Sequence, residues 1–285
     1  MAQQQILISA AALHAASGDP AWSIIDCRFN LADTDEGRRS FEKSHIPGAV
    51  FLDLDRDLSG PVTAESGRHP LPAASAIGKR LGELGVGNTD TVVVYDGGSG
   101  ATAARAWWIL RWLGHKSVFL LDGGFSHWQA RRLPVETRLP ARPSVHYKAQ
   151  ANPALVVTTE ELAADVPGIP ARNLLDARDR LRFAGAEEPI DPVAGHVPGA
   201  KSLPFADFLN ADDTWRPLAE RAALLENALG SDRDVAWCVM CGSGVTACHL
   251  AISGLEAGFS EPQLYVGSWS EWIRDENRPR GTREG

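Results

Sequence analysis

The chain has 285 residues, of which 44% are hydrophobic and 22% are charged, and its formal net charge is −8. This length accommodates one large domain or two ordinary domains, each with its own core. The negative charge argues against nucleic acid as a partner, because nucleic-acid binding requires clustered cations. No apolar run approaches the length that spans a bilayer, so we expect no association with a membrane.

The first predicted element covers residues 6–16, which are rich in alanine and could be mistaken for a signal peptide. The segment lacks a basic stretch before its apolar residues, and a Gly18-Asp19-Pro20 turn follows it. These features are typical of the first helix of a folded domain and not of a cleaved leader. We therefore expect the protein in the cytoplasm.

Short runs of β-branched residues then alternate with amphipathic stretches. The predicted strands of the first half are residues 23–27, 91–95 and 117–121, and the predicted helices include residues 73–84 and 101–113. Prolines in residues 138–153 indicate a linker, so we predict two domains, residues 1–140 and residues 154–285. Buried strands that alternate with helices predict an α/β fold, with a parallel sheet in each domain and helices on both faces of the sheet.

Four motifs of the first half recur in the second half, in the same order and at a nearly constant separation. The matched pairs are Asp26-Cys27-Arg28 with Asp176-Ala177-Arg178, His45-Ile46-Pro47-Gly48-Ala49 with His196-Val197-Pro198-Gly199-Ala200, Gly98-Ser99-Gly100 with Gly242-Ser243-Gly244, and residues 122–128 with residues 266–272. The separation is too long for a solenoid repeat. The pattern therefore predicts a duplicated domain.

One loop in the second half of the chain contains a cysteine and indicates what kind of chemistry the protein can perform. Residues 234–238 are a predicted strand, and residues 245–257 have a helical pattern. Between them, Cys241 precedes a glycine-rich stretch. This order places the thiol at a helix N-terminus, where backbone N–H groups and partial positive charge favour a thiolate. We predict that Cys241 is a nucleophile, whereas Gly97 stands at the matching position of the first half.

The tandem Asp-x-Arg and His-x-Pro-Gly-Ala motifs and the loop Cys241-Gly242-Ser243-Gly244-Val245-Thr246 resemble those of the two-domain rhodanese-type sulfurtransferases, over essentially the whole chain. Within that family the loop is most similar to the loop of 3-mercaptopyruvate sulfurtransferases. The resemblance implies that a sulfane sulfur moves from 3-mercaptopyruvate, through a persulfide on Cys241, to a thiol acceptor such as thioredoxin or glutathione, or to cyanide. Thiosulfate is the alternative donor. The resemblance implies no cofactor, and it implies a catalytic C-terminal domain beside an inactive N-terminal domain.

The resemblance also implies roles for individual residues. Ser243 would act with Asp55 and His69 of the N-terminal domain, and Arg182 would bind the donor carboxylate. The loop residues Gly242, Gly244, Val245 and Thr246 would surround the transferred sulfur. The family has a second substrate arginine before the second His-x-Pro-Gly motif, but the segment Glu187-Glu188-Pro189-Ile190-Asp191-Pro192 contains none. Arg105 could contribute from the other domain or form a salt bridge, and Arg178 fits a structural ion pair.

Other uses of the cysteines are less consistent with the sequence. A zinc site would need ligands in a tetrahedral arrangement, which Cys238, Cys241 and Cys248 do not offer from a strand, a loop and a helix. A redox pair of Cys238 and Cys241 is an alternative, although the glycines follow the second cysteine. A cysteine phosphatase would need an arginine at Ala247. A non-catalytic binding module would leave Cys241 and its loop without a purpose.

Overall fold

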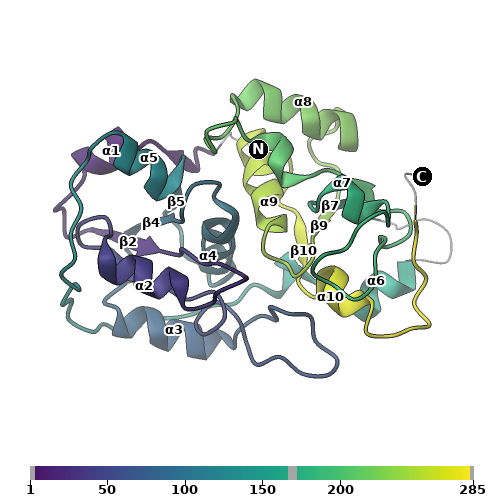
Figure 1. Ribbon diagram of the computed structural model, residues 1–285, viewed down its shortest axis with the longest axis horizontal. Coiled ribbons are helices and arrows are strands. Elements are labelled where there is room, and N and C mark those ends of the chain that lie inside the picture. The colour runs from purple at the N-terminus through teal and green to yellow at the C-terminus, as the bar shows by residue number, and fades with distance from the viewer. Residues whose placement is uncertain (1–3, 166–171, 283–285) are drawn as a thin grey trace.

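The structure, a computed structural model, describes residues 4–165 and 172–282. Within these residues the chain forms two α/β units side by side, each built around a five-stranded parallel sheet (Figure 1). The sheets have the same topology, with strand orders β1-β5-β4-β2-β3 and β6-β10-β9-β7-β8. The expected pair of parallel-sheet domains is confirmed.

The first unit contains five strands and five helices. The strands are β1 (Leu7–Ile8), β2 (Trp22–Asp26), β3 (Val50–Phe51), β4 (Thr91–Tyr95) and β5 (Val118–Leu121). The helices are α1 (Ala10–Ala15), α2 (Glu36–Lys43), α3 (Ala74–Glu83), α4 (Ala101–Trp112) and α5 (Gly124–Ala130). The chain thus enters the sheet through β1 before its first helix, so the stretch 6–16 contains the expected first helix only over residues 10–15. Ile6 is fully buried, and Leu7 and Ile8 pair with β5.

The second unit repeats this plan. Its strands are β6 (Val156–Val157), β7 (Asn173–Asp176), β8 (Lys201–Ser202), β9 (Trp237–Met240) and β10 (Gln263–Tyr265). Its helices are η1 (Pro153–Leu155), α6 (Thr159–Asp165), α7 (Arg180–Phe183), η2 (Phe205–Phe208), α8 (Leu218–Leu229), α9 (Ala247–Glu256) and α10 (Ser268–Trp272). Strand β9 begins three residues later than the sequence suggests and runs directly into Cys241. Helix α9 begins at Ala247 and not at residue 245.

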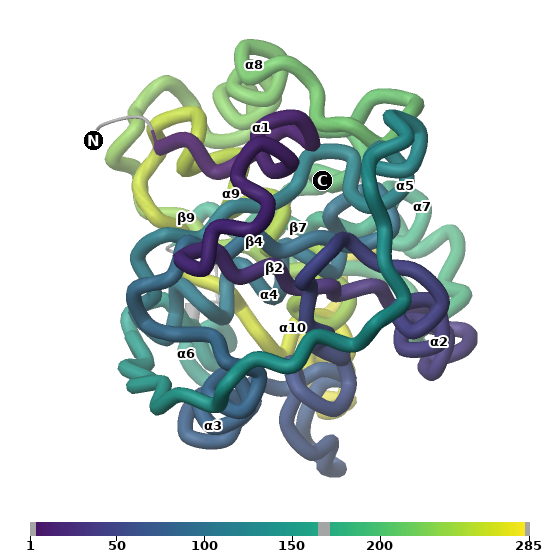
Figure 2. Tube along the Cα trace, turned by 90° about the vertical axis from the view of Figure 1, so that its left-hand side faces the viewer, coloured from purple at the N-terminus to yellow at the C-terminus, as the bar shows by residue number. Residues whose placement is uncertain are grey.

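Alternate residues of each central strand face opposite sides of the sheet, as the period of two requires. In β4, Val93 and Tyr95 pack with α1, α2 and α5, whereas Val92 and Val94 pack with α3 and α4. In β9, Cys238 and Met240 pack with α6 and α10, and Val239 packs with α8 and α9. Helices therefore cover both faces of each sheet, as Figure 2 shows for the first unit, where α1 and α3 lie on opposite sides of β2 and β4.

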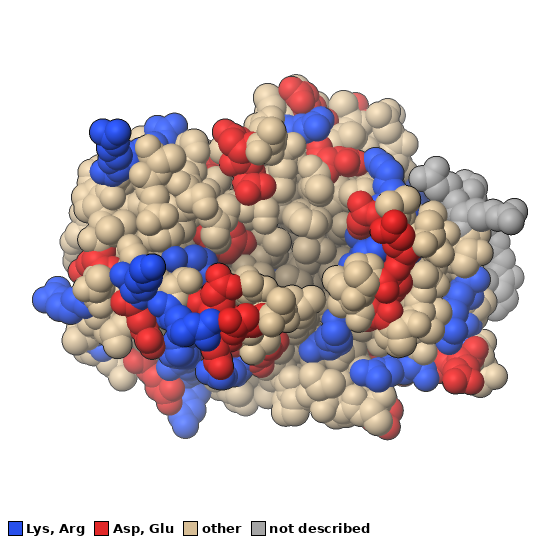
Figure 3. Space-filling view, in the orientation of Figure 1, with Lys and Arg blue, Asp and Glu red and all other residues tan. Residues whose placement is uncertain are grey.

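One apolar cluster continues from the first unit into the second through α4 and α9. Polar contacts add to it, since the carboxylate of Glu256 on α9 accepts hydrogen bonds from the N–H groups of Ile6 and Leu7 at 2.7 and 2.9 Å. Figure 3 shows that the surface is hollowed between the two halves. No helix among the described residues is both long and apolar enough to cross a membrane.

Candidate active site

Cys241 is the first residue after β9, at the carboxyl end of the central strand of the second sheet. Its N–H donates to Oγ of Ser268 at 3.1 Å, and its carbonyl accepts from the N–H of Trp269 at 3.0 Å. Gly244 turns the loop with a φ of 73°, and a Cβ there would lie 2.5 Å from the carbonyl oxygen of Val266. Glycine is therefore required for this loop to reach the start of α9.

The surroundings of Cys241 favour a thiolate. Burial by itself raises the pKa of this thiol, but hydrogen bonds from the Thr246 hydroxyl and from the N–H groups of Ser243 and Ala247 outweigh burial, so that the pKa lies below its ordinary value. Of the loop residues predicted to bind substrate, Thr246 thus contacts the sulfur itself. Gly242, Gly244 and Val245 shape the loop around it. The sequence analysis did not predict that the N–H of Ala247, the first residue of α9, would donate to the sulfur.

At the domain boundary Ser243 contacts His69 of the first unit, and His69 in turn contacts Asp55. Its Oγ lies 2.7 Å from Nδ1 of His69, and Nε2 of His69 lies 3.2 Å from Oδ1 of Asp55. Burial, together with the nearby Arg105 and Arg68, lowers the pKa of His69 to about 3. A neutral His69 that donates through Nε2 to Asp55 has Nδ1 free to accept the Ser243 proton. The three residues therefore form a chain that can move a proton beside Cys241.

Arg105 holds this boundary in place. The side chain is fully buried, and it donates to the carbonyl of Gly244 at 3.0 Å and to the carbonyl of His69 at 3.1 Å. Arg105 thus ties the cysteine loop to the segment that contains His69. Both hydrogen bonds go to backbone carbonyls, so Arg105 has a structural role between the domains, but these contacts are not the expected salt bridge.

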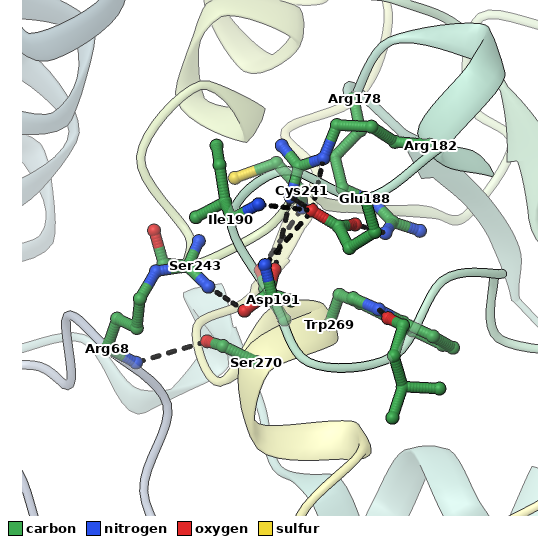
Figure 4. Close-up of polar contacts among 12 residues, drawn as sticks. Arg68, Arg178, Arg182, Glu188, Ile190, Asp191, Cys241, Ser243, Trp269 and Ser270 are labelled. Carbon is green, nitrogen blue, oxygen red and sulfur yellow. Dashed lines mark hydrogen bonds and ion pairs between the residues drawn. The ribbon is translucent and has the colours of Figure 1, made fainter. Parts of the chain in front are cut away.

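Arg182 lies beside the loop and is held by acidic side chains. It bonds to Glu188 at 2.8 Å and to Asp191 at 3.1 Å. The other side of Asp191 bonds to Arg68 of the first unit, so the Asp191 carboxylate lies between two guanidinium groups (Figure 4). Arg178 bonds to Asp176 at 2.7 Å and to the carbonyl of Gly195. Arg178 therefore forms the expected structural ion pair.

Sequence reasoning missed Arg68. The residue directly precedes His69 in the chain, which is the only local signal for it. Its position depends on docking of the two units, because the Arg68 N–H donates to Oγ of Ser270 at 3.1 Å and the Gly67 N–H donates to Glu271 at 3.2 Å. The motif pattern contains no information about that docking.

The matching loop of the first unit has a carboxylate in place of a thiolate. Asp96 precedes Gly97, and its carboxylate accepts hydrogen bonds from the N–H groups of Gly98, Gly100, Thr102 and Ala103 at 3.0 to 3.2 Å. These donors would otherwise be free to stabilise a bound anion. The first loop has therefore lost its nucleophile and also has its anion site filled by its own chain.

The remaining candidates lie apart from this chemistry. His45 and His196 are buried, stack on Phe41 and Phe183, and bond through Nδ1 to backbone carbonyls, as a structural turn requires. All four cysteines are buried, and burial raises the pKa of Cys248 to about 12. Within residues 4–165 and 172–282, no group of three or more His, Cys, Asp or Glu side chains is placed to hold a metal ion.

The fold and the site define a two-domain α/β protein with a cysteine of lowered pKa at the carboxyl ends of the strands of a parallel sheet. The family model for the rhodanese-like domain matches residues 9–131 and 158–275. The chain is 44% identical over 281 residues to a probable 3-mercaptopyruvate sulfurtransferase of Pseudomonas aeruginosa, covering 97% of this chain and 98% of that protein. It is 33% identical over 263 residues to the thiosulfate sulfurtransferase of Mus musculus, covering 90% and 86%.

A solved structure gives the same result. The crystal structure of the 3-mercaptopyruvate sulfurtransferase SseA from Escherichia coli superposes with a TM-score of 0.82 at 31% identity, covering 94% of this chain and all of SseA. The chain therefore belongs to the rhodanese family and is a sulfurtransferase.

Proposed function

We propose that this protein transfers a sulfur atom from 3-mercaptopyruvate, through a persulfide on Cys241, to a thiol or to cyanide. The Cys241 thiolate attacks the sulfur of the donor, and the bond between that sulfur and C3 breaks. The electron pair of that bond remains on C3, so the enolate of pyruvate leaves and takes up a proton. A second nucleophile then removes the outer sulfur of the persulfide. Covalent catalysis of this kind divides one difficult exchange into two easier steps.

The observation that supports this donor is the chain of Ser243, His69 and Asp55. Release of pyruvate requires that a proton be delivered to C3 of the enolate, whereas release of sulfite from thiosulfate requires no proton transfer to carbon. Ser243 lies two residues from the nucleophile and bonds to His69 at 2.7 Å. A proton relay at this place is useful for mercaptopyruvate and unnecessary for thiosulfate.

The loop and its neighbours would bind the reacting groups. The N–H groups and the Thr246 hydroxyl that stabilise the Cys241 thiolate are also suited to a persulfide anion. Arg182, whose Nη2 lies beside Gly242, would bind the donor carboxylate, since a guanidinium matches a carboxylate in shape. In the cytoplasm, the compartment expected from the sequence, glutathione and thioredoxin are the thiols that could accept the sulfur.

The test compares two donors and two variants. After treatment with 3-mercaptopyruvate and no acceptor, intact-mass analysis should find one added sulfur atom on the protein, and Cys241→Ser should prevent the addition. With cyanide as the acceptor, Ser243→Ala should lower kcat for mercaptopyruvate and leave kcat for thiosulfate nearly unchanged. An equal loss for both donors would contradict the proposed relay, and faster turnover of thiosulfate by the wild-type protein would favour the alternative donor.

A further inference from the structure

The guanidinium groups of two arginines from different domains lie beside Gly242, the residue that follows Cys241. A Cβ built on Gly242 would lie 2.8 Å from Nη2 of Arg68 and 3.4 Å from Nη2 of Arg182. Because Gly242 has no side chain, both guanidinium groups lie directly against the backbone of the cysteine loop. A donor whose sulfur touches Cys241 would therefore have two cations within reach.

Asp191 fixes the distance between these arginines. One carboxylate oxygen bonds to Arg68 and the other bonds to Arg182, and the Asp191 side chain is only 3% exposed. The Arg68 side chain is 25% exposed, and its Nε is buried with no hydrogen-bond partner. Arg68 thus has unused donor capacity next to the nucleophile, and its backbone is fixed by Ser270.

The first unit provides a contrast. Gly98 is the counterpart of Gly242, and a Cβ built there would lie 3.1 Å from Oδ2 of Asp213, a residue of the second domain. Each loop is therefore faced by a segment of the other domain. The loop that contains a nucleophile is faced by guanidinium groups, whereas the loop that contains none is faced by a carboxylate.

We propose that Arg68, Asp191 and Arg182 form a donor clamp across the domain boundary, in which both arginines bind the donor carboxylate and Asp191 selects donors with a single negative charge. This inference rests on the proposed function. The clamp also accounts for the absence of an arginine from residues 187–192, where Asp191 stands near the position at which the family has its second substrate arginine. The second guanidinium comes from the other domain instead.

The charges around the clamp explain the selectivity. The two arginines already face two carboxylates, those of Asp191 and Glu188, which are 3% and 4% exposed. A donor with one carboxylate can take up the remaining N–H groups with little repulsion. A dianion such as thiosulfate would place a second negative charge close to Asp191 in a partly buried site, where like charges repel more strongly than in water.

The first test measures how the clamp recognises a carboxylate, without any sulfur transfer. Iodoacetate and iodoacetamide both alkylate a thiolate with loss of iodide, but only iodoacetate has a carboxylate. The ratio of their second-order rate constants at Cys241 should fall about tenfold in Arg68→Gln, because one charge-assisted hydrogen bond is lost. Arg68→Lys, which retains the charge but not the fork, should give an intermediate ratio. An unchanged ratio in Arg68→Gln would overturn the proposal.

Arg111→Gln is the matched control. Arg111 also forms an ion pair across the domain boundary, with Glu261 at 2.8 Å, and its side chain is 19% exposed. It lies on α4, and its partners Glu261 and Gln4 are outside the cysteine loop. The variant should therefore have the wild-type ratio of rate constants. If Arg111→Gln lowered the ratio as much as Arg68→Gln, loosening of the domain boundary would explain the effect and the clamp would be rejected.

The second test concerns Asp191. Asp191→Asn retains the shape of the side chain and removes its charge, so kcat/KM for thiosulfate relative to mercaptopyruvate should rise about tenfold. An unchanged or lower relative value would refute the selective role of Asp191. The proposed function and the donor clamp can be refuted independently of each other. If the wild-type protein gains no sulfur from mercaptopyruvate, the proposed function fails, while the alkylation ratio still decides whether Arg68 binds a carboxylate.

Discussion

Replacement of Thr246 by valine tests how the loop stabilises the thiolate. Valine has nearly the same shape as threonine but cannot donate the hydroxyl hydrogen bond that helps to keep the pKa of Cys241 below its ordinary value. A hydrogen bond to a charged group contributes about 1.5–3 kcal/mol. Each pKa unit corresponds to about 1.4 kcal/mol. The pKa of Cys241 should therefore rise by about one unit. This value is the lower end of the change that the free-energy range implies, because the N–H groups of Ser243 and Ala247 still donate to the sulfur.

The assay is the rate of alkylation by iodoacetamide as a function of pH, since only the thiolate reacts. At pH values below both pKa values, Thr246→Val should react about tenfold more slowly than the wild-type protein, and above both values the two rates should converge. Thr246→Ser retains the hydroxyl and removes only a methyl group, so its profile should match the wild type. Superimposable profiles for Thr246→Val and the wild type would refute the assignment of Thr246 as a thiolate ligand.

Three further outcomes follow from the same contacts. Asp96→Ala should lower the free energy of unfolding by about 3 kcal/mol, because it leaves several buried N–H groups without an acceptor, while the alkylation rate of Cys241 stays unchanged; urea denaturation measures the first and iodoacetamide the second. Because the pKa of His69 is about 3, His69 stays neutral as the pH falls from 7 to 5, so turnover of mercaptopyruvate should show no acid limb due to this residue in that range. Ser268 has a φ of 53°, and Ser268→Gly should relieve strain but remove the hydrogen bond to Cys241, so kcat should fall severalfold with little change in the urea midpoint.

The parts of the fold that depend on short-range pattern could be predicted from the sequence. Strand β4 has the predicted bounds, because four of its five residues are β-branched and the strand lies between polar turns. The start of the chain could not be predicted as easily. Alanines favour helix, but the burial of Ile6 and the pairing of Leu7 and Ile8 with β5 place a strand before α1. Tertiary contact there overrides local propensity.

The site residues also divide into those that local sequence predicts and those that depend on tertiary contacts. The position of Cys241 between a strand and a helix N-terminus could be predicted, because strand, cysteine and glycine-rich loop follow one another in the chain. Asp55 and His69 were reached only through the family resemblance, because their distance from Ser243 depends on how the two domains dock. Arg68 was not found by either route. Arg68 bonds to Asp191, and Asp191 belongs to the segment that departs from the family pattern because it lacks the second substrate arginine.

The two loops show why duplication of a domain did not produce two active sites. Each loop presents backbone N–H groups that require an anion, and each lies at the carboxyl end of a central strand. In the first loop the anion is Asp96, which belongs to the chain and cannot be exchanged. In the second loop the anion is the thiolate of Cys241, which in the proposed function accepts a sulfur atom and passes it on. The residues that face the two loops differ in charge, with Asp213 at the first loop and Arg68 at the second, which agrees with the proposal that the second loop binds an anionic donor.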